Sequence, residues 1–174
     1  MIGIEKFKNV IDEKLCKKLI TYLEDNIEIA YDMKHSNEQR NNVICKQLYV
    51  PDHLDKEVMA CIHIVAEQYA KLYNWFGCSG DVGYQLRRIS GNTLIHADGV
   101  WGARKKDIKE VRTVSIILGL NSNYEKGEFN FPNQNYKTTV KQGEAICFPV
   151  YFMYPHEVSA PKGYRYTINT WLTE

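Results

Sequence analysis

The chain has 174 residues, of which 44% are hydrophobic and 12% aromatic, so residues 1–174 can bury a sizeable core as a single domain. A formal net charge of +1 gives no reason to expect nucleic acid or an acidic membrane surface as a partner, and no apolar run approaches the length of a membrane span. Five cysteines without zinc spacing, and a start without the apolar run of a signal peptide, favour reduced thiols and a cytoplasmic location.

The first part of the chain, residues 1–80, is predicted to supply supporting helices. Asp12 is a candidate N-cap, and apolar residues recur at helical spacing after it until the polar break at Asp25-Asn26. The polar segment from 31 to 42 is expected to be a loop. A second helix is predicted from about Leu54 to Tyr73, because one stripe of that segment is apolar.

Residues 81–174 change to short strands separated by turns. The predicted strands are YQLRRI, RTVSIILGL, EFNF, KTTV, AICFPV and YRYTINTWL. Several strands after two helices indicate an α+β fold that is mainly β, with a β-sandwich or jelly-roll core backed by helices.

The last predicted strand has two chemically different faces. Alternation places Tyr164, Tyr166 and Ile168 on one face, which we expect to pack under the helices. The opposite face is too polar for an ordinary core, and we expect it to line a polar pocket. Its members are Arg165, Thr167, Asn169 and Trp171.

A metal site is indicated by His96, Asp98 and the distant His156. On an extended segment the first two side chains share one face, and two imidazoles with one carboxylate can hold one side of an iron(II) ion. HxD alone is weak evidence, since Asp98-Gly99 also fits a simple turn and His156 also fits a surface position. Arg165, nine positions after His156, strengthens the interpretation because a guanidinium binds carboxylates in a forked geometry.

These residues resemble the Fe(II)/2-oxoglutarate-dependent dioxygenases, especially the prolyl 4-hydroxylase-like branch. The resemblance covers about Tyr84 to Leu172 and lies in HAD at 96–98 and in PHEVSAPKGYRYTINTW from Pro155 to Trp171. It implies a double-stranded β-helix, with His96, Asp98 and His156 as catalytic iron ligands and Arg165 on the distal carboxylate of 2-oxoglutarate.

The implied activity is hydroxylation of an unactivated C–H bond with O₂, releasing succinate and CO₂, with ascorbate as a candidate reductant. A peptide, protein or small amino-acid-like molecule is the expected substrate. Two alternatives stay open: a nucleic-acid demethylase of the same superfamily, disfavoured by the weak net charge, and a jelly-roll binding or structural domain with an incidental metal site. The oligomeric state is not predicted.

The chain departs from the family near Arg88-Ile89-Ser90, where members often place a co-substrate tyrosine. Tyr84 lies further upstream as a candidate replacement. Four residues on inward strand faces are further candidates for the missing hydroxyl or amide: Thr113, Ser115, Thr167 and Asn169.

Three residues are candidates for substrate contact: Trp101, Arg88 and Trp171. Trp101 belongs to the segment 99–110, whose position after the HxD pair resembles a substrate-covering loop in similar enzymes; a solvated charged loop is the alternative. Arg88 also fits a surface salt bridge.

Overall fold

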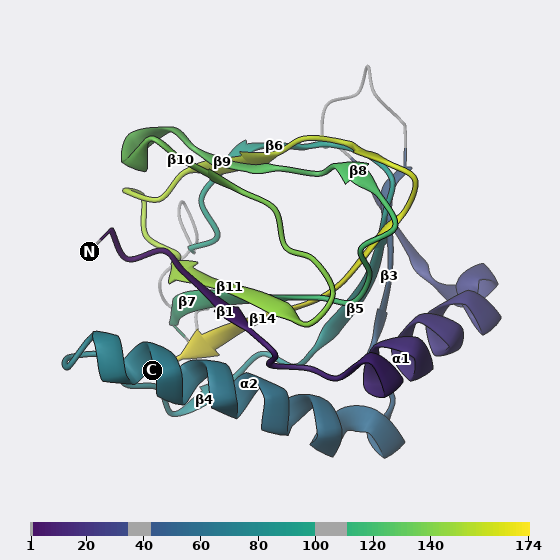
Figure 1. The fold of residues 1–174 in the computed structure, drawn as a ribbon, viewed down its shortest axis with the longest axis horizontal. Helices are drawn as coiled ribbons and strands as arrows, with labels where there is room; N and C mark the ends of the chain where they lie inside the picture. Colours follow the sequence, from purple (N-terminus) through teal and green to yellow (C-terminus); the bar gives the residue numbers. More distant parts are fainter. Residues whose placement is uncertain (1, 35–42, 100–110) are drawn as a thin grey trace.

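The computed structural model describes residues 2–34, 43–99 and 111–174. It places two helices on one side of an eight-stranded sheet and a smaller four-stranded sheet on the other side (Figure 1). The helices are α1 (Glu13–Asp25) and α2 (Asp52–Leu72), with short 3₁₀ turns η1 (Ile27–Ile29) and η3 (Pro132–Gln134). None of the helices in these ranges is long and apolar enough to cross a membrane.

The larger sheet has the order β1-β11-β7-β14-β5-β3-β2, with β4 paired to β14 and all pairs antiparallel. Its strands are β1 (Glu5–Lys8), β2 (Tyr31–Lys34), β3 (Val43–Tyr49), β4 (Gly80–Asp81), β5 (Gln85–Ile89), β7 (Arg112–Gly119), β11 (Glu144–Pro149) and β14 (Arg165–Thr173).

The smaller sheet has the order β10-β9-β12-β6 and carries both metal-ligand histidines at paired positions. Its strands are β6 (Thr93–His96), β9 (Phe129–Phe131), β10 (Tyr136–Thr138) and β12 (His156–Val158). A short pair, β8 (Glu125–Lys126) with β13 (Pro161–Lys162), lies apart from both sheets in pairing. Two facing antiparallel sheets confirm the predicted jelly-roll with supporting helices.

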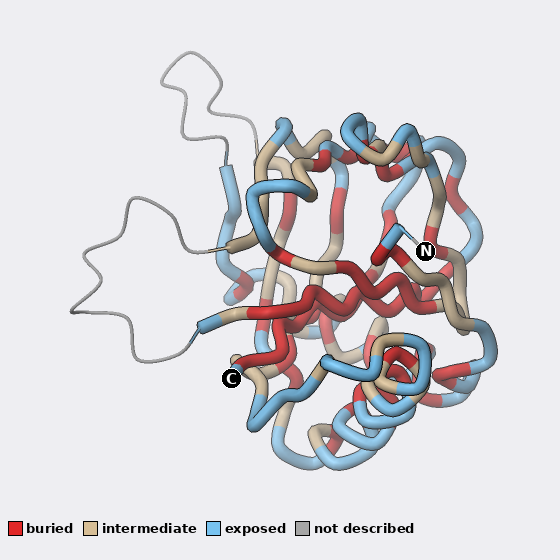
Figure 2. The backbone as a smooth tube through the Cα atoms, turned by 90° about the vertical axis from the view of Figure 1, so that its left-hand side faces the viewer, coloured by how far each residue is buried: buried red, intermediate tan, exposed pale blue. Residues whose placement is uncertain are grey.

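Helix α1 begins where the sequence predicts, because the Asp12 carboxylate accepts a hydrogen bond from the Leu15 amide at 2.7 Å. The apolar stripes of both helices pack on the larger sheet together with Leu86, Ile168 and the alternate residues of β7. The opposite face of the sheet contacts a second core, built around Phe129, Phe131 and Phe148. The strands at the centre of the larger sheet form the most continuously buried stretch of the backbone (Figure 2).

The division into helical support over 1–80 and a jelly-roll core over 81–174 is wrong in one respect. Residues 1–80 also supply β1, β2 and β3, which extend the larger sheet at both edges. The segment expected to be a loop from 31 therefore begins with a strand, paired with β3 in antiparallel register. All four residues of that strand are exposed, so the sequence shows no buried face that would reveal it. The extent of a single domain over 1–174 stays a prediction.

Candidate metal and co-substrate site

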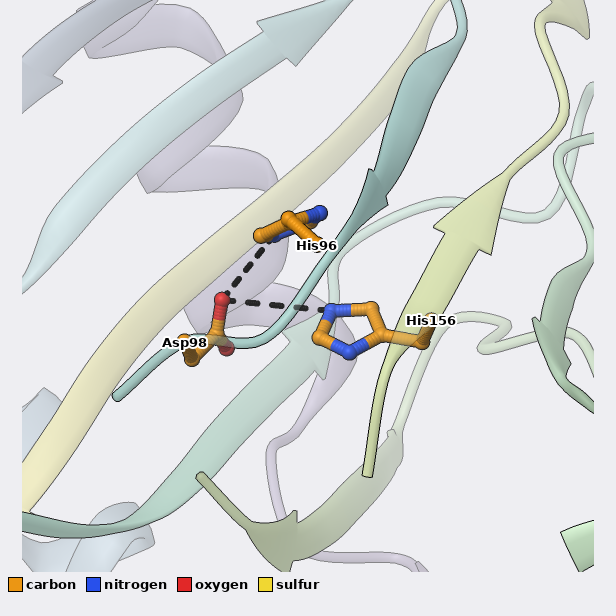
Figure 3. Close-up of side chains that lie close together, drawn as sticks. All are labelled: His96, Asp98 and His156. Carbon is orange, nitrogen blue, oxygen red and sulfur yellow. Dashed lines mark hydrogen bonds and ion pairs between the residues drawn. The ribbon is translucent and has the colours of Figure 1, made fainter. Parts of the chain in front are cut away.

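His96, Asp98 and His156 come together as the candidate metal ligands (Figure 3). Their potential ligand atoms all lie within 4.8 Å of one another. Asp98 Oδ1 is 3.0 Å from His96 Nε2 and 3.9 Å from His156 Nε2. The cause is local pairing: β6 and β12 are antiparallel neighbours, and His96 is opposite His156 in their register.

Both imidazole rings are oriented by the backbone in the same way. The Nδ1 atom of His96 lies 2.8 Å from the Leu94 carbonyl oxygen, and that of His156 lies 3.2 Å from the Tyr154 carbonyl oxygen. With Nδ1–H donating to a carbonyl, each Nε2 keeps its lone pair for a metal. Two histidines that bind the carbonyl two residues upstream therefore present Nε2 toward the same point as Asp98.

Asp98 is held as a carboxylate although it is buried. Burial favours the neutral acid, but hydrogen bonds from His96 and Ser115 and the nearby His156 outweigh it and hold the pKa of Asp98 below its usual range. The Ser115 hydroxyl donates to Asp98 Oδ2. Ser115, predicted to bind the co-substrate, instead orients the carboxylate of the candidate metal ligand Asp98.

His156 lies in an aromatic box. Its ring centroid is 4.8 Å from that of Phe148 and 5.2 Å from that of Phe131, and the residue is 2% exposed. Burial lowers the pKa of His156, whereas the hydrogen bond to Asp98 raises that of His96. The buried imidazole is therefore the more easily kept neutral, as a metal ligand must be.

The three candidate ligands line a cavity of about 340 Å³ between the two sheets. Arg165, Asn169 and Trp171 line it from β14, so the predicted inward face of that strand is confirmed. The alternate residues Tyr166 and Ile168 pack against the helix-side core, as predicted. The prediction is wrong for Tyr164, which precedes the strand and is 49% exposed. The cavity volume lies at the lower end of the range for small-molecule sites.

Arg165 is buried in this cavity and lacks a full set of partners. It is 2% exposed, its Nη1 donates to the Gly127 carbonyl oxygen at 2.9 Å, and its Nε has no partner among the described residues. Burial lowers the pKa of Arg165 to about 10, so the side chain still carries its charge near neutral pH. A buried guanidinium without an anion indicates that a ligand carboxylate belongs there.

Glycine is required at position 127, next to Arg165. The residue has φ +68°, and a Cβ there would lie 3.1 Å from the Tyr124 ring and 3.5 Å from Arg165 Cδ. The absence of a side chain lets the backbone carbonyl approach the guanidinium. The sequence pattern Gly127-Glu128-Phe129 thus marks one wall of the anion site.

Two other predicted residues also lie on the inward face. Thr167 is buried and its hydroxyl donates to Asn169 Oδ1 at 2.7 Å, which leaves it no free proton for a ligand. Trp171 lines the cavity, and its indole Nε1 has no hydrogen-bond partner within the described part of the chain.

The predictions for Tyr84 as a co-substrate ligand and for Arg88 as a substrate contact are wrong. Tyr84 belongs to the helix-side core, and its hydroxyl donates to Asp81 Oδ2 at 2.8 Å, so it does not replace the co-substrate tyrosine. Arg88 forms an ion pair with Glu24 of α1 at 2.9 Å, on the helix side of the sheet. Trp101 and the rest of the predicted substrate loop after Gly99 lie outside the described residues.

Sequence reasoning missed Arg87 and Arg112, which both line the cavity. A signal for Arg87 was available, because Leu86 is an obvious core residue and alternation places residue 87 on the opposite face. Arg112 stands at the start of β7, where alternation is not yet established.

Two histidines and one carboxylate leave coordination positions open inside a jelly-roll, beside a buried arginine whose Nε has no partner among the described residues. This arrangement is typical of a non-haem iron(II) oxygenase. The sequence signature of the 2OG-Fe(II) oxygenase superfamily matches residues 84–173. The chain belongs to this superfamily.

Solved structures share the fold at low sequence identity. The viral collagen prolyl hydroxylase of Paramecium Bursaria Chlorella virus-1, in complex with 2-oxoglutarate, is 18% identical with a TM-score of 0.74, covering 98% of this chain and 96% of that one. A Trichoplax adhaerens prolyl hydroxylase, in complex with a hypoxia inducible factor peptide, is 15% identical with a TM-score of 0.73, covering 99% and 84%. A Pseudomonas putida prolyl-4-hydroxylase is 15% identical with a TM-score of 0.70, covering 99% and 92%. No curated protein matches the chain.

The residues present fit iron(II) and 2-oxoglutarate. His96, Asp98 and His156 supply a borderline nitrogen and oxygen donor set that leaves coordination positions open. Arg165 would supply the cation for the far carboxylate, because it is buried and its Nε has no partner among the described residues. The protein is a 2-oxoglutarate-dependent oxygenase.

Proposed function

We propose that this enzyme hydroxylates an unactivated C–H bond of a peptidyl or amino-acid substrate, as prolyl 4-hydroxylases do. The observation that carries the proposal is the convergence in one cavity of the His96–Asp98–His156 triad with Arg165, a buried cation without a carboxylate partner among the described residues. In the overall reaction, one O₂ oxidises both molecules: the substrate gains one oxygen atom as hydroxyl, and 2-oxoglutarate becomes succinate and CO₂.

The bound iron and 2-oxoglutarate supply the oxidising power, and the protein supplies binding and orientation. The triad holds the metal by one side, and Ser115 and the two backbone carbonyls fix the directions of its ligands. Arg165 anchors the co-substrate at the far end of the cavity. The aromatic rings packed around His156 bury that imidazole and would keep water away from the ligand on that side.

An apolar groove beside the triad supports a peptidyl substrate. It has a volume of about 620 Å³ and shares His96, Ala97 and Arg112 with the metal cavity. Its outer wall includes Phe152, which is 86% exposed. A solvent-exposed apolar surface next to a catalytic metal suits a chain of residues better than a small polar metabolite. Two solved structures with this fold support the same substrate class, since one is a collagen prolyl hydroxylase and the other holds a hypoxia inducible factor peptide.

Two measurements test the proposal. Anaerobic addition of iron(II) and 2-oxoglutarate should give a weak visible charge-transfer band, and aerobic incubation should release succinate. The His96→Ala variant should do neither. Mass spectrometry of peptides and free amino acids after incubation should then find a gain of one oxygen. A protein without the band and without metal-dependent succinate would contradict the enzyme assignment.

The proposed site of action is the cytoplasm, with ascorbate as a candidate reductant. All five cysteines are free thiols, and only Cys78 is exposed. Such thiols suit a reducing compartment. Detection of the native protein in fractionated cells tests the location, and succinate yield with and without ascorbate tests the reductant.

A further inference from the structure

The metal cavity contains more arginines than are needed to balance the charges of the metal, its carboxylate ligand and 2-oxoglutarate. Among its described lining residues the cations are Arg87, Arg112 and Arg165, and the sole carboxylate is that of Asp98. An iron(II) ion with Asp98 has one net positive charge, and Arg165 brings the total to two. The two carboxylates of 2-oxoglutarate balance that total. Arg87 and Arg112 then remain uncompensated.

Neither remaining arginine has a carboxylate partner in the ranges that the structure describes. Arg87 donates from Nε to Gln47 Oε1 at 2.8 Å and from Nη2 to Gln85 Oε1, both neutral amide oxygens. Arg112 donates from Nη1 to the backbone oxygen of Asp98 at 3.5 Å. Burial lowers the pKa of Arg87, and the neighbouring charge of Arg112 acts in the same direction. A guanidinium held in place by neutral groups is ready to receive an anion.

Both guanidinium groups flank the same indole ring. The Cζ atom of Arg112 lies 4.1 Å from the Trp171 ring centroid, and that of Arg87 lies 5.9 Å from it. The unpartnered Trp171 Nε1–H adds a third donor to this group. Trp171 stands six residues beyond Arg165 on β14, about 20 Å along an extended strand. Trp171 and Arg112 therefore lie at the opposite end of the strand from the co-substrate anchor. The backbone of Arg87 pairs with Thr167, between the two ends, and its guanidinium reaches to 5.9 Å from the Trp171 ring.

Arg112 connects this cluster, which it forms with Arg87 and Trp171, to the apolar groove proposed for the substrate. Arg112 lines both the metal cavity and the apolar groove, whereas Arg165 lines the cavity alone. We propose that Arg87 and Arg112 bind a carboxylate of the substrate, beside the carbon that the enzyme hydroxylates. This inference rests on the proposed function. The carboxylate belongs either to an acidic side chain of a peptide or to the main-chain terminus of an amino-acid-like substrate.

Matched ligand pairs test this proposal by binding rather than by turnover. The full chain is loaded with Mn(II) and 2-oxoglutarate, and calorimetry measures the affinity for two pairs. Acetyl-Asp-Pro-Asp-amide is compared with acetyl-Asn-Pro-Asn-amide, and acetyl-proline with acetyl-prolinamide. In at least one pair the carboxylate should bind about 10-fold to 100-fold more tightly than the amide, as expected for charge-assisted hydrogen bonds. The preferred pair identifies the source of the carboxylate.

Substitutions test whether Arg87 and Arg112 cause the preference for the carboxylate ligand over the amide. Arg87→Gln and Arg112→Gln should each reduce it by about 10-fold. Arg88→Gln is the matched control, because Arg88 neighbours Arg87 in sequence but points to Glu24 on the other face of the sheet, and the preference should survive. Arg112 is only partly buried, so Arg112→Gln carries the test if Arg87→Gln does not fold.

Equal binding, or no binding, of both members in every pair overturns the carboxylate proposal. So does a preference that Arg87→Gln and Arg112→Gln leave intact. Succinate release without any added peptide is measured in parallel. Its presence upholds the oxygenase assignment when the carboxylate preference fails, and its loss marks failure of the proposed function itself.

Discussion

The two faces of strand β14 place polar groups in opposite situations. On the helix side, the Tyr166 hydroxyl donates to Glu24 at 2.8 Å, and the same carboxylate pairs with Arg88. On the cavity side, Arg165 is more deeply buried than any of these groups, yet its Nε has no partner among the described residues. On the helix side the charged and phenolic groups pair within the protein, and the Thr170 hydroxyl, which lacks a partner among the described residues, is neutral. On the cavity side a charged guanidinium lacks a full set of partners, which a ligand carboxylate would complete. Polar residues on the first face support stability and those on the second support binding.

The largest expected effect comes from removing a metal ligand on the cavity side. Asp98→Ala should weaken Mn(II) binding by more than about 100-fold, because loss of even an outer-shell partner already weakens metal sites by about 10-fold to 100-fold. Calorimetry with Mn(II) measures this without oxidation. His63→Ala, at an exposed position on α2, is the control and should bind as the wild type does. Unchanged binding in Asp98→Ala would show that the metal lies elsewhere.

On the helix side, a large effect on stability, and none on ligand binding, is expected. Leu86 is fully buried between the larger sheet and the helices. Leu86→Ala should lower the free energy of unfolding by about 2–5 kcal/mol through lost burial and a residual cavity. The affinity of the folded protein for 2-oxoglutarate should not change. Urea denaturation measures the first quantity, and Ile64→Ala, at an exposed apolar position on α2, should shift it by less than about 0.5 kcal/mol.

Arg165→Gln, on the cavity side, should weaken co-substrate binding, in contrast to Leu86→Ala, which should change only stability. The metal-loaded variant should bind 2-oxoglutarate about 10-fold to 100-fold more weakly, because a charge-assisted hydrogen bond contributes about 1.5–3 kcal/mol. Arg88→Gln, one strand away on the other face, should leave that affinity unchanged. Calorimetric titration of 2-oxoglutarate compares the two variants. Equal affinities in both would remove Arg165 from the co-substrate site.

This two-faced pattern explains how much of the site could be predicted from the sequence. Strand β14 is nine residues long, so its alternation was clear and placed Arg165 and Trp171 correctly. The HxD spacing placed His96 and Asp98 on one face, which the close approach of their ligand atoms confirms. Long, regular segments carry their own orientation signal.

Shorter segments depend on pairing with distant parts of the chain. Strands β6 and β12 have four and three residues, too few to show alternation, and their register brings His96 opposite His156. Arg87 and Arg88 are identical in type, so composition could not separate them. Alternation from the buried Leu86 assigns them to opposite faces, and each is then held by a partner from elsewhere, Gln47 on β3 for Arg87 and Glu24 on α1 for Arg88.

A smaller effect is expected for Ser115, which joins the cavity face to the metal. Ser115→Ala should weaken Mn(II) binding by about 10-fold to 100-fold, because Asp98 loses the hydroxyl that orients it. Ser115→Thr retains a hydroxyl and should restore most of the affinity. Thr113→Val is the matched control on the same strand face, since that hydroxyl donates only to the Leu172 backbone oxygen. If Ser115→Ala changed 2-oxoglutarate affinity at saturating metal, the hydroxyl would belong to the co-substrate instead.

The smallest effect is expected for Glu24, the carboxylate that satisfies the helix side. Glu24→Gln keeps an acceptor for the Tyr166 hydroxyl but removes the charge opposite Arg88, whose side chain is 18% exposed. Partly exposed ion pairs contribute at most about 1 kcal/mol, so the free energy of unfolding should fall by no more than that. Added salt should reduce the difference from the wild type, because screening weakens the pair that the variant lacks. Glu57→Gln, which breaks a more exposed pair with Lys18 between α1 and α2, should change stability less. A change of 2-oxoglutarate affinity in Glu24→Gln would mean that charge on the helix side reaches the cavity through the sheet, and the separation of the two faces would fail.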